Sequence, residues 1–116
     1  MDIRRKTFVA EATSRLSFLI QEHGFAAPEV TEDGNFPLVI HVIYHRGDLE
    51  MRESLVLSYG GEEYVTAHLE HKNPARRTEL HAGTAHTGFQ MWRALDRHAL
   101  ALREFFGEQD PMAQLR

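Results

Sequence analysis

Apolar residues recur every three or four positions near both ends of the chain and alternate with polar ones in between. The first stripe predicts an amphipathic helix over residues 3–23, because this spacing places its members on one helix face. Gly24 should end this helix, since glycine adopts the left-handed conformation that closes a helix without steric cost. A second stripe predicts a helix over residues 84–106, and its members are Phe89, Trp92, Leu95, Ala99, Leu102 and Phe106.

The central part of the chain has the pattern of short strands joined by tight turns. Strands are predicted over residues 28–32, 36–45, 49–59 and 63–71, where β-branched and aromatic residues gather. Gly34, Gly47 and the pair Gly60-Gly61 mark the turns between them. Connections this short favour antiparallel pairing of neighbouring strands. Residues 72–83 are polar, and we expect irregular chain there, with Asn73 capping a short helical turn.

These elements predict one α+β domain spanning residues 1–116, with an ordered core over residues 3–107. Its order is α-β-β-β-β-α, a four-stranded antiparallel meander with helices on one face. The second strand is apolar on both faces, so we expect the sheet face opposite the helices to be buried as well, at least at this strand. The cover would be one of the helices or a second copy of the chain, which makes a homodimer possible. Trp92 is assigned to the core, with a protein interface as the alternative.

The composition narrows the function classes. The chain has 116 residues and no cysteine, which excludes disulfides, thiolate metal sites and cysteine nucleophiles. It has no long apolar run and no signal-like N-terminal segment, so we expect a cytoplasmic protein without membrane association.

Negative charge gathers in the middle of the chain. Residues 29–70 contain nine acidic residues and two arginines, whereas the net charge of the whole chain is −4. An acidic sheet would repel phosphates, so no nucleic-acid binding is expected. It would suit a basic partner protein, although a solvated surface that keeps the protein in solution is the alternative.

Eight histidines raise the question of a metal site. His41 and His45 share a strand face but lie too far apart along it to bind one ion, and His68 and His71 point to opposite faces. No HExxH motif is present. We therefore predict no metal and no cofactor.

One acid–base pair emerges from the predicted register. If Gly60-Gly61 forms a two-residue loop, Glu53 lies opposite His68 on the more apolar face of the sheet. Such a pair occurs in active sites, in buried ion pairs and in surface pairs. Glu53 and His68 are thus candidate catalytic residues, but no serine or threonine sits in an elbow motif to complete a triad.

The layout resembles small α+β immunity-like proteins of bacterial polymorphic-toxin systems. The resemblance covers roughly half of the chain: the helix end at residues 19–25, then residues 39–44 and 49–55. It implies a stoichiometric, non-enzymatic binder that acts through an acidic surface, and it assigns no individual residue. The sequence thus predicts an immunity-like or regulatory protein-binding domain, and the alternative is a small enzyme or ligand-binding domain with a Glu53/His68 pocket between sheet and helices. The candidate partner-binding residues are Glu50, Arg52, Glu63 and Trp92.

Overall fold

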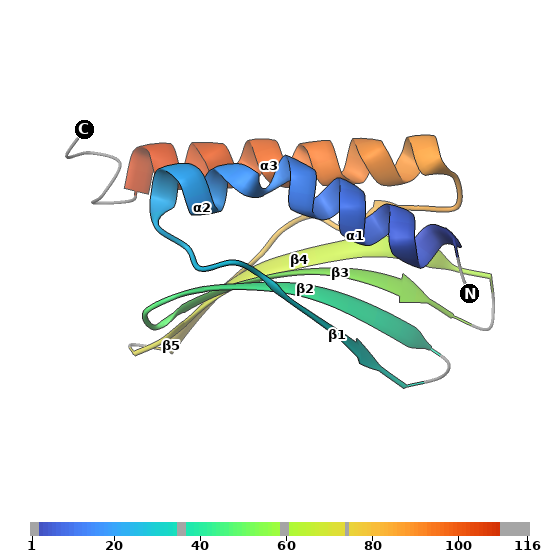
Figure 1. Ribbon diagram of the computed structural model, residues 1–116, viewed down its shortest axis with the longest axis horizontal. Helices are drawn as coiled ribbons and strands as arrows, with labels where there is room; N and C mark the ends of the chain where they lie inside the picture. Colours follow the sequence, from blue (N-terminus) through green and yellow to red (C-terminus); the bar gives the residue numbers. More distant parts are fainter. Residues whose placement is uncertain (1–2, 35–36, 59–60, 74, 110–116) are drawn as a thin grey trace.

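The computed structural model describes residues 3–34, 37–58, 61–73 and 75–109. Three helices lie on one side of a twisted antiparallel sheet and leave its other side uncovered (Figure 1). The helices are α1 (Ile3–Arg15), α2 (Ser17–His23) and α3 (Gly88–Gln109). The strands are β1 (Glu29–Asp33), β2 (Leu38–Arg46), β3 (Leu49–Leu57), β4 (Glu63–Lys72), β5 (Ala75–Glu79) and β6 (Gly83–Thr84).

The predicted first helix is present but broken into α1 and α2 at Leu16. Thr13 and Ser17 donate hydroxyl hydrogen bonds to backbone oxygens three or four residues earlier. Such bonds compete with the regular helix pattern and bend it. Gly24 ends α2 with a φ of 75°, as the sequence predicts.

The α+β class and the antiparallel sheet are confirmed, but the predicted number of four strands is wrong. β5 occupies part of residues 72–83, where irregular chain and a helical turn are expected, and β6 pairs with β4 beside it. All five residues of β5 are exposed. An edge strand of this kind needs no apolar alternation, so its polar sequence hides it from pattern analysis.

The loop between β3 and β4 is longer than predicted. The Ser58 N–H donates to the Glu62 oxygen at 3.1 Å, and the last strand pair is Leu57 with Glu63. A five-residue connection replaces the predicted two-residue loop, whose Gly60 lies outside the described residues. The pairing of β3 with β4 is therefore shifted by one residue from the predicted register. After such a shift, two residues predicted to lie opposite each other point to different faces of the sheet.

The core lies between the helices and the covered face of the sheet. Leu49, Met51, Leu55 and Leu57 all point into it, as the alternation of β3 predicts. No helix in the described ranges is long and apolar enough to cross a membrane.

The last helix begins later than predicted because a capping box forms at Thr87. The Thr87 hydroxyl accepts from the Gln90 N–H at 3.1 Å, and the Gln90 side chain accepts from the backbone of His86 and Thr87. The assignment of Trp92 to the core is wrong, since it is 43% exposed and Phe89 is 64% exposed. The buried stripe of α3 is instead Met91, Ala94, Leu95, His98, Leu102 and Phe106.

Candidate functional site

The uncovered side of the sheet, here called the open face, carries most of the polar side chains of the strands. Register places them in rows that run across the strands. One row is Thr31, His41, Ser54 and Thr66; the next is Glu29, Ile43, Arg52, His68 and Glu79; a third is His45, Glu50, Glu70 and Arg77.

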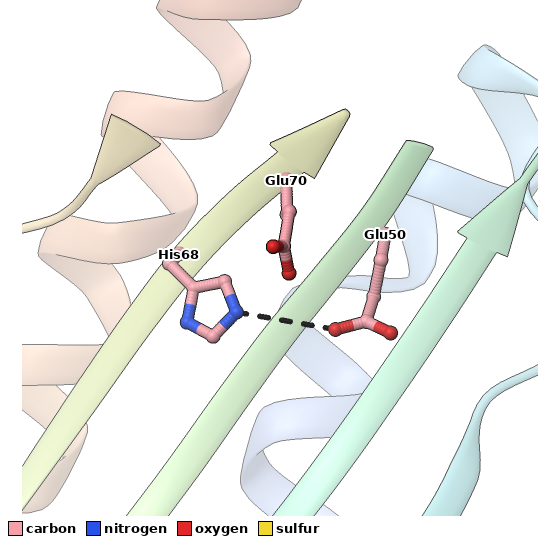
Figure 2. A group of neighbouring side chains, drawn as sticks. All are labelled: Glu50, His68 and Glu70. Atoms are coloured by element: carbon pink, nitrogen blue, oxygen red, sulfur yellow. Dashed lines mark ion pairs between the residues drawn. The ribbon is translucent and has the colours of Figure 1, made fainter. Parts of the chain in front are cut away.

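Three side chains converge on this face between β3 and β4. Glu50, His68 and Glu70 point toward one another (Figure 2), and each offers a ligand atom within 4.8 Å of the others. The His68 Nε2 lies 3.9 Å from a Glu50 oxygen. Neither side chain is freely solvated, since Glu50 is 13% exposed and His68 is 15% exposed. The cluster is therefore a fixed, half-buried group of charges.

Two guanidinium groups accompany this cluster. Arg52 lies 3.2 Å from Glu50, and Arg77 lies 3.3 Å from the Nδ1 of His68. Burial lowers the pKa of His68, the nearby Arg77 and Arg52 lower it further, and the charges of Glu50 and Glu70 oppose this only in part. His68 is therefore neutral near pH 7, as a metal ligand must be. The two arginines already offset the two carboxylates, however, which weakens the attraction for a cation.

A second polar chain crosses the open face between β1 and β3. His41 Nε2 lies 2.9 Å from an Asp33 oxygen, and His41 Nδ1 lies 2.6 Å from Ser54 Oγ. His41 and Ser54 are buried, whereas the Asp33 side chain is 73% exposed. His41 and Ser54 line a shallow hollow of about 320 Å³, which Arg52, Arg77, His68 and Glu70 also line.

The structure separates the two predicted catalytic residues, so their pairing is wrong. Glu53 pairs with Ala67, and His68 pairs with Arg52, which places Glu53 and His68 on opposite faces of the sheet. His68 lies on the open face, whereas Glu53 lies in the core and is completely buried. They share no pocket.

Glu53 has a histidine partner nevertheless, and that partner comes from α3. Glu53 Oε2 lies 2.6 Å from His98 Nδ1, and His98 Nε2 lies 2.6 Å from the His81 backbone oxygen. A carbonyl only accepts, so Nε2 carries a proton and a second proton is shared between Nδ1 and Glu53. The pair ties α3 to β3 and to the segment before β6.

The pKa of His98 reflects this geometry. Burial lowers it, but the hydrogen bond and the charge of Glu53 and the bond to His81 raise it more, so the net direction is upward. Burial also raises the pKa of the neighbouring Tyr44 hydroxyl to about 12. Because Glu53 is completely buried and His98 is 2% exposed, the pair is closed off from solvent, and we interpret it as a structural contact.

The four predicted partner-binding residues do not form one surface. Glu50 and Arg52 lie side by side on the open face. Glu63 lies on the covered side, where it forms an ion pair with Arg4 of α1. Trp92 is exposed on α3. The open face thus unites only two of the four.

Asp33, His41 and Ser54 are absent from the candidates that the sequence provides. The available signal was the period of two along β2 and β3, which puts His41 and Ser54 on the face opposite the core. Their contact depends on the pairing of these strands, which the turn at Gly47 sets.

Comparisons with family models, with curated proteins and with solved structures returned no match.

Proposed function

We propose that this chain is a protein-binding domain of the immunity-like or regulatory kind, and that its open face contacts a basic segment of a partner protein. The observation that carries the proposal is the uncovered side of the sheet, which the three helices leave bare while they cover the other (Figure 1). An antiparallel sheet with one side exposed offers a broad, rigid surface for a partner.

Charge favours a basic partner. The described strands place five carboxylates on the open face, against the basic side chains of Arg52, Lys72 and Arg77. Complementary charge of this kind steers a partner toward the surface and selects its orientation. The carboxylates are Glu29, Asp33, Glu50, Glu70 and Glu79.

The centre of this face is already ordered. Glu50 contacts Arg52 at 3.2 Å, His45 at 3.2 Å and His68 at 3.9 Å. A side chain held in place loses less conformational entropy when a partner covers it, which favours binding. Glu50 and Arg52 are therefore the two residues we place at the centre of the interface.

A second copy of the chain is the alternative occupant, because Val39, Ile43, Val56 and Tyr64 also belong to the open face. A small enzyme built on Glu53 and His68 is not proposed, since the two lie on opposite faces. The cytoplasm remains the expected compartment.

The test is affinity capture from an extract of the source organism, with variants of matched charge. Glu29→Lys/Glu70→Lys reverses two charges on the open face, and Glu22→Lys/Glu104→Lys reverses two on the helices. We expect a basic protein to be captured by the unmodified chain and by the helix variant but not by the open-face variant. Sedimentation of the same three proteins tests for self-association. A monomer that captures nothing, or equal capture by both variants, would contradict the proposal.

A further inference from the structure

We propose that Ser54 is a nucleophile activated by His41 and Asp33, and that the hollow beside it accepts a small ester whose acid part carries a negative charge. This activity goes beyond the proposed binding function and would stand without any partner protein. It rests on the polar chain that links β1, β2 and β3 on the open face.

The donors and acceptors among Asp33, His41 and Ser54 follow from the groups involved. An ionised carboxylate only accepts, so the His41 Nε2 carries the proton that is donated to Asp33 across 2.9 Å. In a neutral imidazole the Nδ1 then holds a lone pair, and the Ser54 hydroxyl donates to it across 2.6 Å. This is the arrangement in which a histidine removes the proton of a serine, with the carboxylate fixing the tautomer. The two ring nitrogens exchange the positions they have in the best-known triads, which leaves the proton path intact.

Burial holds the two central residues in this geometry. Ser54 is 5% exposed and His41 is 8% exposed, and their strands pair at this position. Both line the hollow of about 320 Å³, so a small molecule resting in it would lie against the pair. A hollow of this size fits a short-chain ester rather than a peptide segment.

The lining of the hollow defines the substrate class. Besides His41 and Ser54, the lining comprises one carboxylate, two guanidinium groups and three other side chains: Glu70, Arg52, Arg77, His68, Thr66 and Val39. The two guanidinium groups outnumber the one carboxylate of the lining, and Arg77 suits a carboxylate on the acid part of the ester. The backbone N–H groups of β3 are used in pairing with β2 and β4, so the developing oxyanion must be stabilised by side chains. Arg52 is placed for this, since it lies two residues from Ser54 on the same strand face.

The reaction balances without a cofactor. Ser54 Oγ attacks the ester carbonyl carbon, and its proton passes to His41 Nδ1, while Asp33 stabilises the imidazolium. Collapse of the tetrahedral intermediate breaks the bond to the alcohol oxygen, which takes the proton from Nδ1. A water molecule then releases the acid from Ser54 by the same route, and the hydroxyl is restored.

The test uses two probes, a fluorophosphonate and the 4-nitrophenyl monoester of succinic acid. We expect intact mass to show one phosphonyl adduct, peptide mapping to place it on Ser54, and Ser54→Ala to abolish it. His41→Gln should slow labelling by about 10²-fold or more, because general-base catalysis contributes about 10²–10⁴-fold. Ser14→Ala, which alters an exposed serine of α1, should label like the unmodified chain.

Two further measurements separate activation from a merely structural role. Added imidazole should restore labelling of His41→Ala, in which the space beside Ser54 is open. Arg77→Gln should slow hydrolysis of the succinyl ester more than that of neutral 4-nitrophenyl acetate, whereas Arg52→Gln should slow both. Circular dichroism establishes that each variant is folded before it is scored. No adduct on Ser54 in the folded, unmodified chain would overturn the proposal, and so would equal labelling of His41→Gln.

Discussion

Each face of the sheet has a glutamate beside a histidine, but the two pairs differ in separation, burial and neighbouring charge. On the covered face, Glu53 and His98 are 2.6 Å apart and buried in the core. On the open face, Glu50 and His68 are 3.9 Å apart and half-buried among other charges. The comparison shows that a pair of residue types does not decide its role, because the surroundings decide it.

The surroundings shift the pKa values of the two histidines in opposite directions. Burial lowers the pKa of both His98 and His68. For His98 the hydrogen bond and charge of Glu53, with the bond to His81, outweigh burial and raise the pKa, and no cation among the described residues opposes them. For His68 the guanidiniums of Arg77 and Arg52 act in the same direction as burial. His98 of the covered pair therefore keeps its proton to higher pH than an ordinary histidine, whereas His68 of the open pair loses its proton at lower pH.

The largest expected effect is on the covered pair. His98→Ala leaves the buried Glu53 without its partner and should lower the free energy of unfolding by about 3–5 kcal/mol. His68→Ala removes a partly solvated contact and should cost about 1 kcal/mol or less. Urea unfolding followed by circular dichroism measures both.

Both variants replace a histidine with alanine, one in the core on α3 and the other on the open face in β4. An equal loss of stability in the two would show that the Glu53–His98 contact adds nothing beyond an ordinary surface pair. Burial would then not explain a difference in stability between the two glutamate–histidine pairs.

The second prediction concerns pH. The unfolded chain loses a histidine proton near the ordinary pKa of about 6.5, whereas the folded chain keeps the His98 proton to higher pH because Glu53 holds it. The folded state then binds more protons, so the free energy of unfolding falls as pH rises above 6.5 and through the raised pKa. The slope is at most about 1.4 kcal/mol per pH unit. Below pH 6.5 this stabilisation is fully present.

Two glutamine variants sharpen the measurement. In Glu53→Gln the amide can donate to Nδ1 of a neutral His98 while Nε2 still donates to His81, so the slope above pH 6.5 should flatten. Glu50→Gln on the open face should leave the slope above pH 6.5 close to that of the unmodified chain, because the lowered pKa of His68 keeps this histidine largely neutral there. A slope that persists in Glu53→Gln would place its origin elsewhere in the protein.

The fold could be read from the sequence as far as apolar periodicity reaches. It predicts both long helical segments, the four strands between them and the face of β3 that meets the helices. Apolar periodicity does not reveal a strand that buries no apolar side chain, such as β5, whose residues are all exposed. It also fails at Trp92, because Met91, Ala94 and Leu95 are the residues that face the core in this part of α3.

The candidate site was less predictable because it depends on register. Placing Glu53 opposite His68 required the loop between β3 and β4 to have the right length, and an error of one residue sent the two side chains to opposite faces. The partner of Glu53, His98, lies 45 residues away on another element. No local pattern connects such residues, since only packing of α3 on the sheet brings them together.

The smallest expected effect tests why the open pair differs from the covered one. Arg77→Gln removes a positive charge next to the His68 ring and should raise the pKa of His68, measured by NMR titration of its imidazole protons. The rise should stop short of the ordinary value, because burial is the larger cause of the lowered pKa and remains in the variant. Glu50→Gln should move the same pKa further down, since it removes a charge that favours protonation. Arg93→Gln on α3 should leave it unchanged. If Arg77→Gln also left it unchanged, burial alone would set the state of His68, and the neighbouring charges would no longer explain why the two faces differ.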